Sequence, residues 1–148
     1  MRNFLLTTTT MIRLSNTESY LENAILLTLK IHSSLFLELP NQQTPLHIAT
    51  DKCNIDIVKY LVEQGHADVN DKGKYGRTPL HIATEKCNID IIKYLVEQCH
   101  ADVNAKDRNE QTPLHIATEK GLIEVIKYFV EQCHANVEAK DKFGNTPL

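Results

Sequence analysis

The heptapeptide TPLHIAT occupies Thr44–Thr50 and recurs unchanged at Thr78–Thr84 and Thr112–Thr118. Each copy begins 34 residues after the previous one, and Thr146–Leu148 repeats the first three residues of the motif in the same phase. A fixed period of this length indicates one supersecondary unit stacked on copies of itself, because a single unit cannot bury its own apolar face. The repeat therefore determines the architecture.

Similarity between the copies extends well beyond the motif. Residues 44–70 and 78–104 are identical at 24 of 27 positions, and residues 112–138 match the second copy at 20 of 27. Where the copies differ, an apolar residue often replaces another, as Phe129 replaces Leu95. A packed core tolerates substitutions of this kind, so these positions are predicted to face a core.

Residues 10–43 lack the motif but keep its apolar pattern in the same frame. Leu27, for example, lies one period before Leu61. We interpret 10–43 as a degenerate first repeat, with an unrelated flanking helix as the alternative. Residues 1–9 are predicted to be a disordered N-terminus.

Each unit predicts two helices. Thr44 is a suitable N-cap, and Pro45 at the first helical position loses nothing by lacking an N–H group. Asn54 is the expected N-cap of the second helix, whose apolar residues recur at three- and four-residue spacing. We therefore expect helix pairs near 44–64, 78–98 and 112–132, and a weaker pair within 11–31.

The polar side of the second helix carries Asp56, Lys59 and Glu63. Their spacing predicts ion pairs within the helix, on a solvated outer face. The helix is followed by a short extended piece, Ala67–Asn70, and by a turn-rich segment, Asp71–Arg77, that contains two glycines.

The combination of TPLH at the start of a helix pair, ADVN after it and a projecting AKD turn resembles the ankyrin repeat, strongly over 44–148 and weakly over 10–43. The resemblance implies an all-α solenoid of stacked helix-turn-helix units with short β-hairpin-like fingers. It also implies that the first helices and the fingers line a concave groove, while the second helices form a convex back. The expected units are 10–43, 44–77, 78–111 and 112–145, with 146–148 as the truncated start of a further repeat.

The chain departs from the family pattern in two places. Its period exceeds the usual 33 residues by one, near Gly65–His66, where the family has a left-handed glycine that ends the helix. We therefore expect a reshaped helix exit. The finger glycine, present at Gly76 and Gly144, is replaced by Glu110 and Gln42. A non-glycine residue costs about 1 kcal/mol there if the position needs a positive φ.

Composition narrows the choice of partner. The 148 residues are 42% apolar with a net charge of −3, which argues against a general nucleic-acid binder. The sequence has no run of 18 uncharged apolar residues, so no membrane partner is expected. The apolar run Phe4–Leu6 is too short for a secretory signal, and organelle targeting stays as an alternative.

The four cysteines occur in two phases of the repeat. Cys53 and Cys87 share one position, and Cys99 and Cys133 share another. Equivalent atoms in stacked helices lie ~8–10 Å apart, whereas a disulfide needs Cα atoms within ~7 Å. No second ligand pair accompanies them, so free thiols and no metal are expected. Free thiols fit an intracellular compartment, either cytoplasmic or nuclear.

No catalytic arrangement is apparent in the sequence. His47, His81 and His115 recur at one helix-start position, which favours a structural hydrogen bond over a catalytic base. The family resemblance implies that this histidine helps to hold the finger. No nucleophile with a nearby base, phosphate loop or acid pair accompanies the histidines, so we expect neither an enzyme nor a cofactor.

The helices are nearly constant, whereas the finger tips vary and place Tyr75 and Phe143 at the same phase. Aromatic residues often anchor interfaces, although drift in exposed loops is the alternative. The family resemblance points to the finger tips and the exposed end of the first helix. Carried over by position, the candidate partner-binding residues are Lys72, Lys74, Tyr75, Arg77, Glu85, Lys86, Lys106, Arg108, Asn109, Gln111, Glu119, Lys120, Lys140, Lys142, Phe143 and Asn145.

The sequence therefore predicts a non-catalytic scaffold that binds another protein through this groove. Because the tips carry excess positive charge, a partner with an acidic surface is expected. The alternative is a targeting or regulatory segment of a larger enzyme, channel or adaptor. Terminal repeats usually carry a polar outer face, and the last complete unit has none, so self-association through it and truncation of a longer array are further expectations.

Overall fold

The structure is a computed structural model that describes residues 43–148. The predicted disordered N-terminus, the degenerate first repeat, the helix pair within 11–31 and the position of Gln42 lie outside the described residues.

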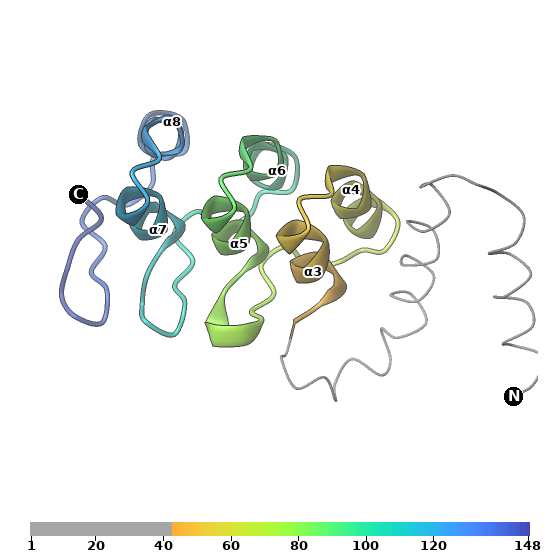
Figure 1. Cartoon of the computed structure of the whole chain (residues 1–148), viewed down its shortest axis with the longest axis horizontal. Coiled ribbons are helices and arrows are strands. Elements are labelled where there is room, and N and C mark those ends of the chain that lie inside the picture. The colour runs from red at the N-terminus through yellow and green to blue at the C-terminus, as the bar shows by residue number, and fades with distance from the viewer. Residues whose placement is uncertain (1–42) are drawn as a thin grey trace, which may run out of the picture. The chain divides into compact units, whose positions relative to one another are not determined.

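Three helix pairs follow one another along the described part of the chain. Figure 1 shows the first helices in one row and the second helices in another, with the fingers projecting on the side of the first helices. The expected helix pairs and the all-helical class are therefore confirmed. The pairs are α3 (Pro45–Asp51) with α4 (Ile55–Glu63), α5 (Pro79–Glu85) with α6 (Ile89–Lys93), and α7 (Pro113–Glu119) with α8 (Ile123–Lys127).

The starts of the helices follow from their capping residues. In each first helix the threonine and the histidine of the motif form a reciprocal capping box, with proline in the first turn. The side chains of Asn54 and Asn88 accept hydrogen bonds from the backbone N–H groups of Ile57 and Ile91. Leu122 occupies this position before α8 and provides no side-chain cap.

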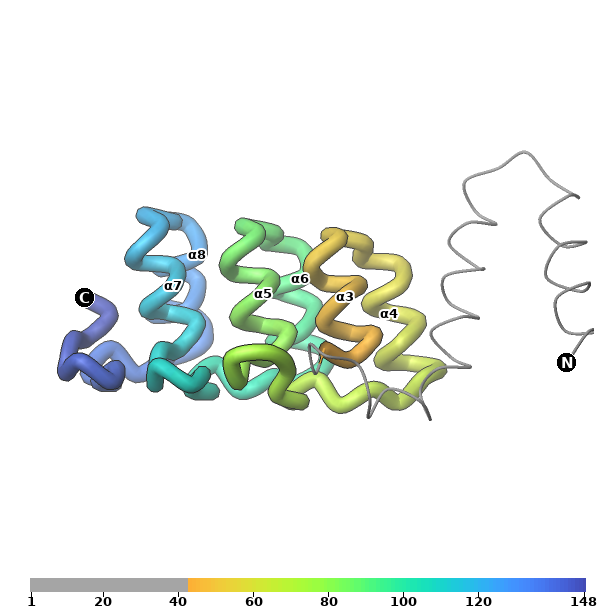
Figure 2. The backbone as a smooth tube through the Cα atoms, turned by 60° about the horizontal axis from the view of Figure 1, so that its bottom comes forward, coloured from red at the N-terminus to blue at the C-terminus, as the bar shows by residue number. Residues whose placement is uncertain are grey.

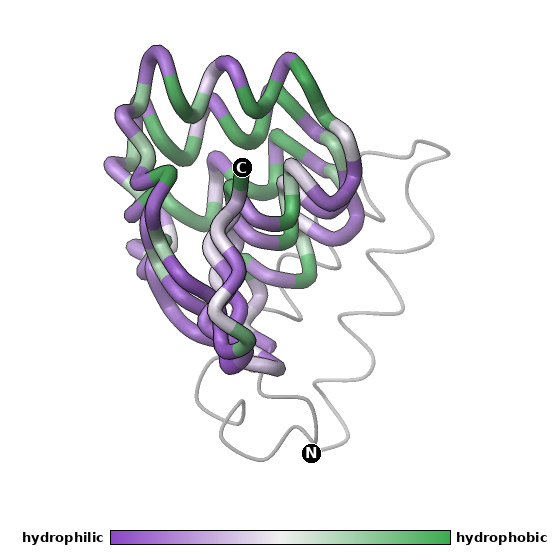
Figure 3. The backbone as a smooth tube through the Cα atoms, turned by 90° about the vertical axis from the view of Figure 1, so that its left-hand side faces the viewer, coloured by the Kyte–Doolittle hydropathy of each residue, from purple (hydrophilic) through white to green (hydrophobic). Residues whose placement is uncertain are grey.

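The core lies between the two rows of helices and between neighbouring units. Leu80 of α5 and both Ile91 and Ile92 of α6 are fully buried, at 0% exposure. Figure 2 shows α3, α5 and α7 side by side, and the repeated leucine of the motif is fully buried in all three helices, as Leu46, Leu80 and Leu114. Figure 3, viewed along the stack, shows hydrophobic residues mainly in the helices and hydrophilic residues mainly along the fingers.

The extra residue of the 34-residue period is accommodated at the end of the second helix. α6 and α8 continue into π-helical turns, η3 (Tyr94–Gln98) and η4 (Tyr128–Gln132). In the last copy the N–H of Cys133 donates to the carbonyl oxygen of Tyr128, five residues back, at 3.2 Å. A π turn holds one residue more than an α turn, so the insertion widens the helix without displacing its apolar face.

The left-handed residue at this exit is the histidine. His66, His100 and His134 have φ values of 50°, 55° and 51°. The family pattern places a left-handed glycine here, but Gly65 is not among the residues with positive φ. The helix exit is therefore reshaped in all three copies, including the one that retains the glycine.

On the outer face, the structure corrects the predicted pairing within the helix. Among residues 43–148, no ion pair joins Asp56, Lys59 and Glu63. Instead, the Tyr94 hydroxyl of the next unit donates to Glu63 Oε1 at 3.1 Å, and Lys59 Nζ lies 5.7 Å from the centroid of the same ring. Tyr128 makes the same two contacts, a hydrogen bond to Glu97 and a cation–π contact with Lys93, so these charged residues bind a tyrosine of the next repeat.

The fingers are hydrogen-bonded turns, and no residue between 43 and 148 lies in a strand. Gly76, Glu110 and Gly144 share one finger position, with φ values of 72°, 59° and 83°. The position is therefore left-handed in every finger, and Glu110 carries the strain that glycine avoids.

Replacing Glu110 by Gly is expected to raise the free energy of unfolding by about 0.5–1 kcal/mol, because glycine adopts this backbone without strain. Urea denaturation of the two proteins measures the difference. Asn109→Gly is the matched control, since Asn109 is not left-handed and an added glycine there only makes the unfolded chain more flexible. An equal response of the two variants would show that the left-handed backbone of Glu110 stores no strain.

Candidate functional site

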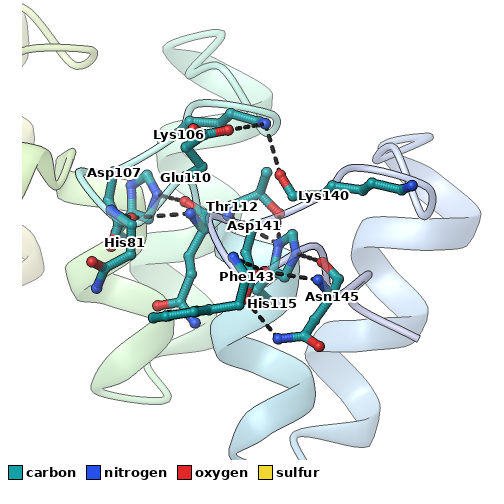
Figure 4. Close-up of polar contacts among 12 residues, drawn as sticks. His81, Lys106, Asp107, Glu110, Thr112, His115, Lys140, Asp141, Phe143 and Asn145 are labelled. Carbon is teal, nitrogen blue, oxygen red and sulfur yellow. Dashed lines mark hydrogen bonds and ion pairs between the residues drawn. The ribbon is translucent and has the colours of Figure 1, made fainter.

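Each finger is attached to the first helix of its own repeat by a histidine. His81 Nε2 lies 3.0 Å from the carbonyl oxygen of Gln111, and its Nδ1 accepts from the backbone N–H of Thr78 at 3.1 Å. Figure 4 shows this bond and its counterpart, His115 with Asn145. His47 bonds the Arg77 carbonyl oxygen in the same way, at 2.9 Å.

These bonds define the protonation state of the ring. A carbonyl oxygen can only accept, so Nε2 carries the proton, and Nδ1 must be unprotonated to accept from the threonine N–H. Burial lowers the pKa of His47 and of His81, which keeps both rings neutral. The expectation that this histidine is a structural hydrogen bonder that holds the finger is confirmed.

Within the second and third fingers an aspartate organises the turn. Asp107 Oδ1 accepts from the backbone N–H of Asn109 at 2.7 Å and of Gln111 at 3.0 Å. Asp141 makes the equivalent bonds in the third finger. Although burial raises the pKa of Asp141, hydrogen bonds from Asn145 and Phe143 outweigh it and hold that pKa below its usual range.

The first finger has Gly73 where the other two have aspartate, and its tip differs accordingly. The Gly76 N–H donates to the Gly73 carbonyl oxygen at 3.0 Å, as the equivalent residues do in the other fingers. Without a carboxylate to collect further backbone N–H groups, the Arg77 N–H donates to the Lys74 carbonyl oxygen at 3.3 Å. Tyr75 is left-handed, with φ 62° and ψ 16°. The aspartates were not among the candidate residues of the sequence, although an aspartate whose side chain bonds the backbone two residues on is a recognised turn-forming residue.

Neighbouring fingers are joined to one another. The Arg108 N–H donates to the Tyr75 carbonyl oxygen, and the Lys142 N–H donates to the Asn109 carbonyl oxygen, both at 2.8 Å. Lysine side chains add further links, because Lys72 Nζ donates to the Lys106 carbonyl oxygen at 2.7 Å and Lys106 Nζ to that of Lys140 at 2.8 Å. Figure 4 shows the second of these lysine bonds.

Four of the candidate residues form internal ion pairs, one of them, Lys106 with Glu110, within a single finger. Arg77 Nη1 lies 2.6 Å from Glu85 Oε2, and Arg77 Nε lies 3.7 Å from an oxygen of buried Asp107 in the next finger. Lys86 Nζ lies 3.0 Å from Asp51 Oδ1 of the preceding unit, and this contact raises the pKa of Lys86. These side chains connect repeats, so they are less suited to anchor a partner than the sequence predicted.

The tips of the fingers hold the two exposed aromatic candidates. Tyr75 is 56% exposed and Phe143 is 77% exposed, and Lys74 Nζ lies 4.8 Å from the centroid of the Tyr75 ring. We use the term tip row for the two successive residues at the tip of each finger, namely Lys74, Tyr75, Arg108, Asn109, Lys142 and Phe143.

The remaining candidates lie beside this row. Glu119 and Lys120 are exposed at the end of α7. Gln111 and Asn145 contribute their carbonyl oxygens to the histidine bonds. The structure therefore brings six of the predicted residues together in the tip row and assigns most of the others to contacts that hold the fingers.

Other kinds of site find no support in the described residues. Between 43 and 148 no group of three or more His, Cys, Asp or Glu side chains is placed to hold a metal ion. All four cysteines, which lie in this range, are free thiols, and burial raises the pKa of Cys99 and of Cys133. None of the helices in this part of the chain is both long and apolar enough to cross a membrane.

Comparison with known families agrees with the repeat geometry. A family model described as ankyrin repeats (3 copies) matches residues 16–107, and one described as ankyrin repeats (many copies) matches residues 85–130. No curated protein matches the chain. The first match spans more than half of the sequence, and the two matches together contain the three helix pairs with their capping boxes and the first two histidine-held fingers. The chain belongs to the ankyrin-repeat family.

Proposed function

We propose that this domain binds another protein through its fingers and first helices, with the tip row as the principal contact. Ankyrin repeats are in general protein-binding modules, and the matched families contain no catalytic domain. The finer assignment, to the tip row and to an acidic partner, is our proposal.

The observation that supports it best is the exposure of two aromatic side chains on braced turns. Tyr75 and Phe143 occupy the same position of the first and third fingers, and more than half of each side chain is open to solvent. Aromatic anchors contribute strongly to interfaces because they bury a large area and lose little side-chain entropy. The bonds between the fingers hold them in position before a partner arrives.

Charge favours an acidic partner. Each finger carries one basic residue in the tip row, namely Lys74, Arg108 or Lys142, although the whole chain has a net charge of −3. A local excess of positive charge attracts an acidic surface and accelerates its association. Because these side chains are exposed, added salt should screen the attraction and slow association.

Replacing Tyr75 and Phe143 together by Asn is expected to weaken partner binding by about 2 kcal/mol or more. Asn is the residue at the same position of the middle finger, and it tolerates the left-handed backbone of Tyr75. Pull-down with the unmodified chain recovers the partner, and titration with each variant then gives the dissociation constants.

Lys127→Ala is the control for this experiment. Lys127 is exposed on α8, on the opposite side from the fingers, and its loss should change the affinity by less than about 0.5 kcal/mol. A melting curve for each variant separates a loss of binding from a loss of folding. If the double variant binds as tightly as the unmodified chain while Lys127→Ala binds more weakly, the partner binds the second helices and not the tip row.

A further inference from the structure

The tip row has a regular spacing along the stack. Its basic residues, Lys74, Arg108 and Lys142, are each 34 residues apart and stand at the same position of successive fingers. Packed helices lie ~8–10 Å apart, so stacked repeats place successive basic residues at about that interval. The row therefore presents three cationic positions along one line.

The line is held at a fixed spacing by backbone bonds. The Arg108 N–H bonds the Tyr75 carbonyl oxygen, and the Lys142 N–H bonds the Asn109 carbonyl oxygen, so each tip is attached to the one before it. Lys74 is further positioned by its contact with the Tyr75 ring. A peptide segment whose acidic residues recur at the spacing of the fingers could therefore bind without reorganising them.

Polyproline II is the regular peptide conformation with the best matching period. It has three residues per turn and rises ~3.1 Å per residue, so one face returns every ~9.3 Å. A β-strand returns to the same face after about 6.8 Å, which is too short. A helix returns after seven residues and about 10.5 Å, and it usually binds through a continuous apolar stripe, whereas the two tip aromatics are two repeats apart.

Building on the proposed function, we infer that the tip row binds a partner segment in polyproline II conformation that carries Asp or Glu at every third position. One carboxylate meets the basic residue of each finger. Tyr75 and Phe143 pack against the prolines between the acidic residues, since aromatic side chains are the usual surface for such segments. A proline-rich segment is already extended, so little conformational entropy is lost when it binds.

Two synthetic peptides of equal composition and charge test the spacing. In EPPEPPEPP the glutamates are three residues apart, whereas in EPEPEPPPP they are two apart. Both are titrated against the full chain at low salt by fluorescence anisotropy. The first is expected to bind at least about fivefold more tightly, because the second cannot place all of its carboxylates on successive fingers. Equal affinities of the two peptides would overturn the inference that the acidic residues must be three residues apart.

A charge exchange tests the contact with individual fingers. Lys142→Glu should weaken binding of EPPEPPEPP, and replacing one terminal glutamate of the peptide by lysine should restore it. The terminus that restores binding gives the direction of the segment. Lys127→Glu on α8 makes the same change of charge away from the fingers. Neither of the lysine-containing peptides should bind this variant more tightly than EPPEPPEPP does. Equal behaviour of the two variants would show that only net charge matters.

A helical peptide with glutamates seven residues apart separates this inference from the proposed function. If it binds more tightly than EPPEPPEPP and depends on Lys142, the polyproline inference is wrong, while binding at the tips stands. If the Tyr75 and Phe143 double variant binds the natural partner as well as the unmodified chain does, the proposed function itself fails.

Discussion

Replacing His81 by Ala is expected to lower the free energy of unfolding by about 3 kcal/mol. The side chain is fully buried and satisfies two backbone groups, the Thr78 N–H and the Gln111 carbonyl oxygen. Removing it leaves both groups without a partner, and each unsatisfied buried polar group costs about 1–3 kcal/mol. The deleted ring also leaves a cavity between the first helix and its finger.

Urea denaturation monitored by circular dichroism measures this loss. His100→Asn is the control, because His100 is also repeated in every unit but is exposed, and asparagine tolerates its left-handed backbone. The control should change stability by no more than about 0.5 kcal/mol. A loss below 1 kcal/mol for His81→Ala, comparable with the control, would mean that the histidine bonds do not hold the fingers.

Acidification is expected to destabilise the fold from about pH 6.5 downwards. Burial lowers the pKa of His47 and of His81 from the ordinary value of 6.5, so below that pH the unfolded chain binds more protons than the folded one. The stability that these two histidines contribute is therefore fully present above pH 6.5 and falls as the pH drops towards their pKa in the folded state. Between the unfolded and the folded pKa, each histidine contributes a slope of up to about 1.4 kcal/mol per pH unit.

Urea denaturation at pH 7.5, 6.5 and 5.5 tests this dependence. His81→Ala should lose part of the slope, whereas His100→Asn should keep all of it. The carboxylate of Asp141 acts in a separate window, because its lowered pKa stabilises the fold above the ordinary value of 3.8 and this contribution is lost only below it. Equal slopes in all three proteins would exclude the buried histidines as the cause.

Local chemistry explains what the sequence predicted well. Thr-Pro and Asn-Ile are strong helix starts, and both kinds of helix begin where these residues are. The comparison of Glu110 with two glycines at the same phase singled out a position where a positive φ would cost a non-glycine residue energy, and the structure shows that the position is left-handed. The helix starts depend on a few neighbouring residues within one repeat, whereas the finger position became visible only when the repeats were compared.

Contacts between repeats were predicted less well. Glu63 was expected to pair within its helix, but it accepts from Tyr94 of the next unit, because stacking brings that hydroxyl within reach. Arg77 was predicted as a partner-binding residue, and its contacts with Glu85 and Asp107 across the repeat boundary were not foreseen. Spacing within one helix gives no information about these distances, which depend on how closely successive layers pack.

At the helix exit, the sequence indicated where the extra residue falls but not which residue becomes left-handed. Three consecutive residues, Gln64, Gly65 and His66, could each end the helix. The π turn moves the end one residue along the chain, so the histidine takes the conformation that glycine takes in the family pattern.

The lysine bonds between fingers have a consequence for how the array changes in length. Lys72 donates to the backbone at Lys106, and Lys106 donates to the backbone at Lys140, so the middle unit both donates and accepts, and all three units carry lysine at this phase. A tandem duplication of any block of 34 residues would produce a unit that already carries both halves of each contact. Lengthening by whole periods therefore requires no compensating mutation, whereas an insertion of any other length would disturb the donors and acceptors of the layer in which it falls.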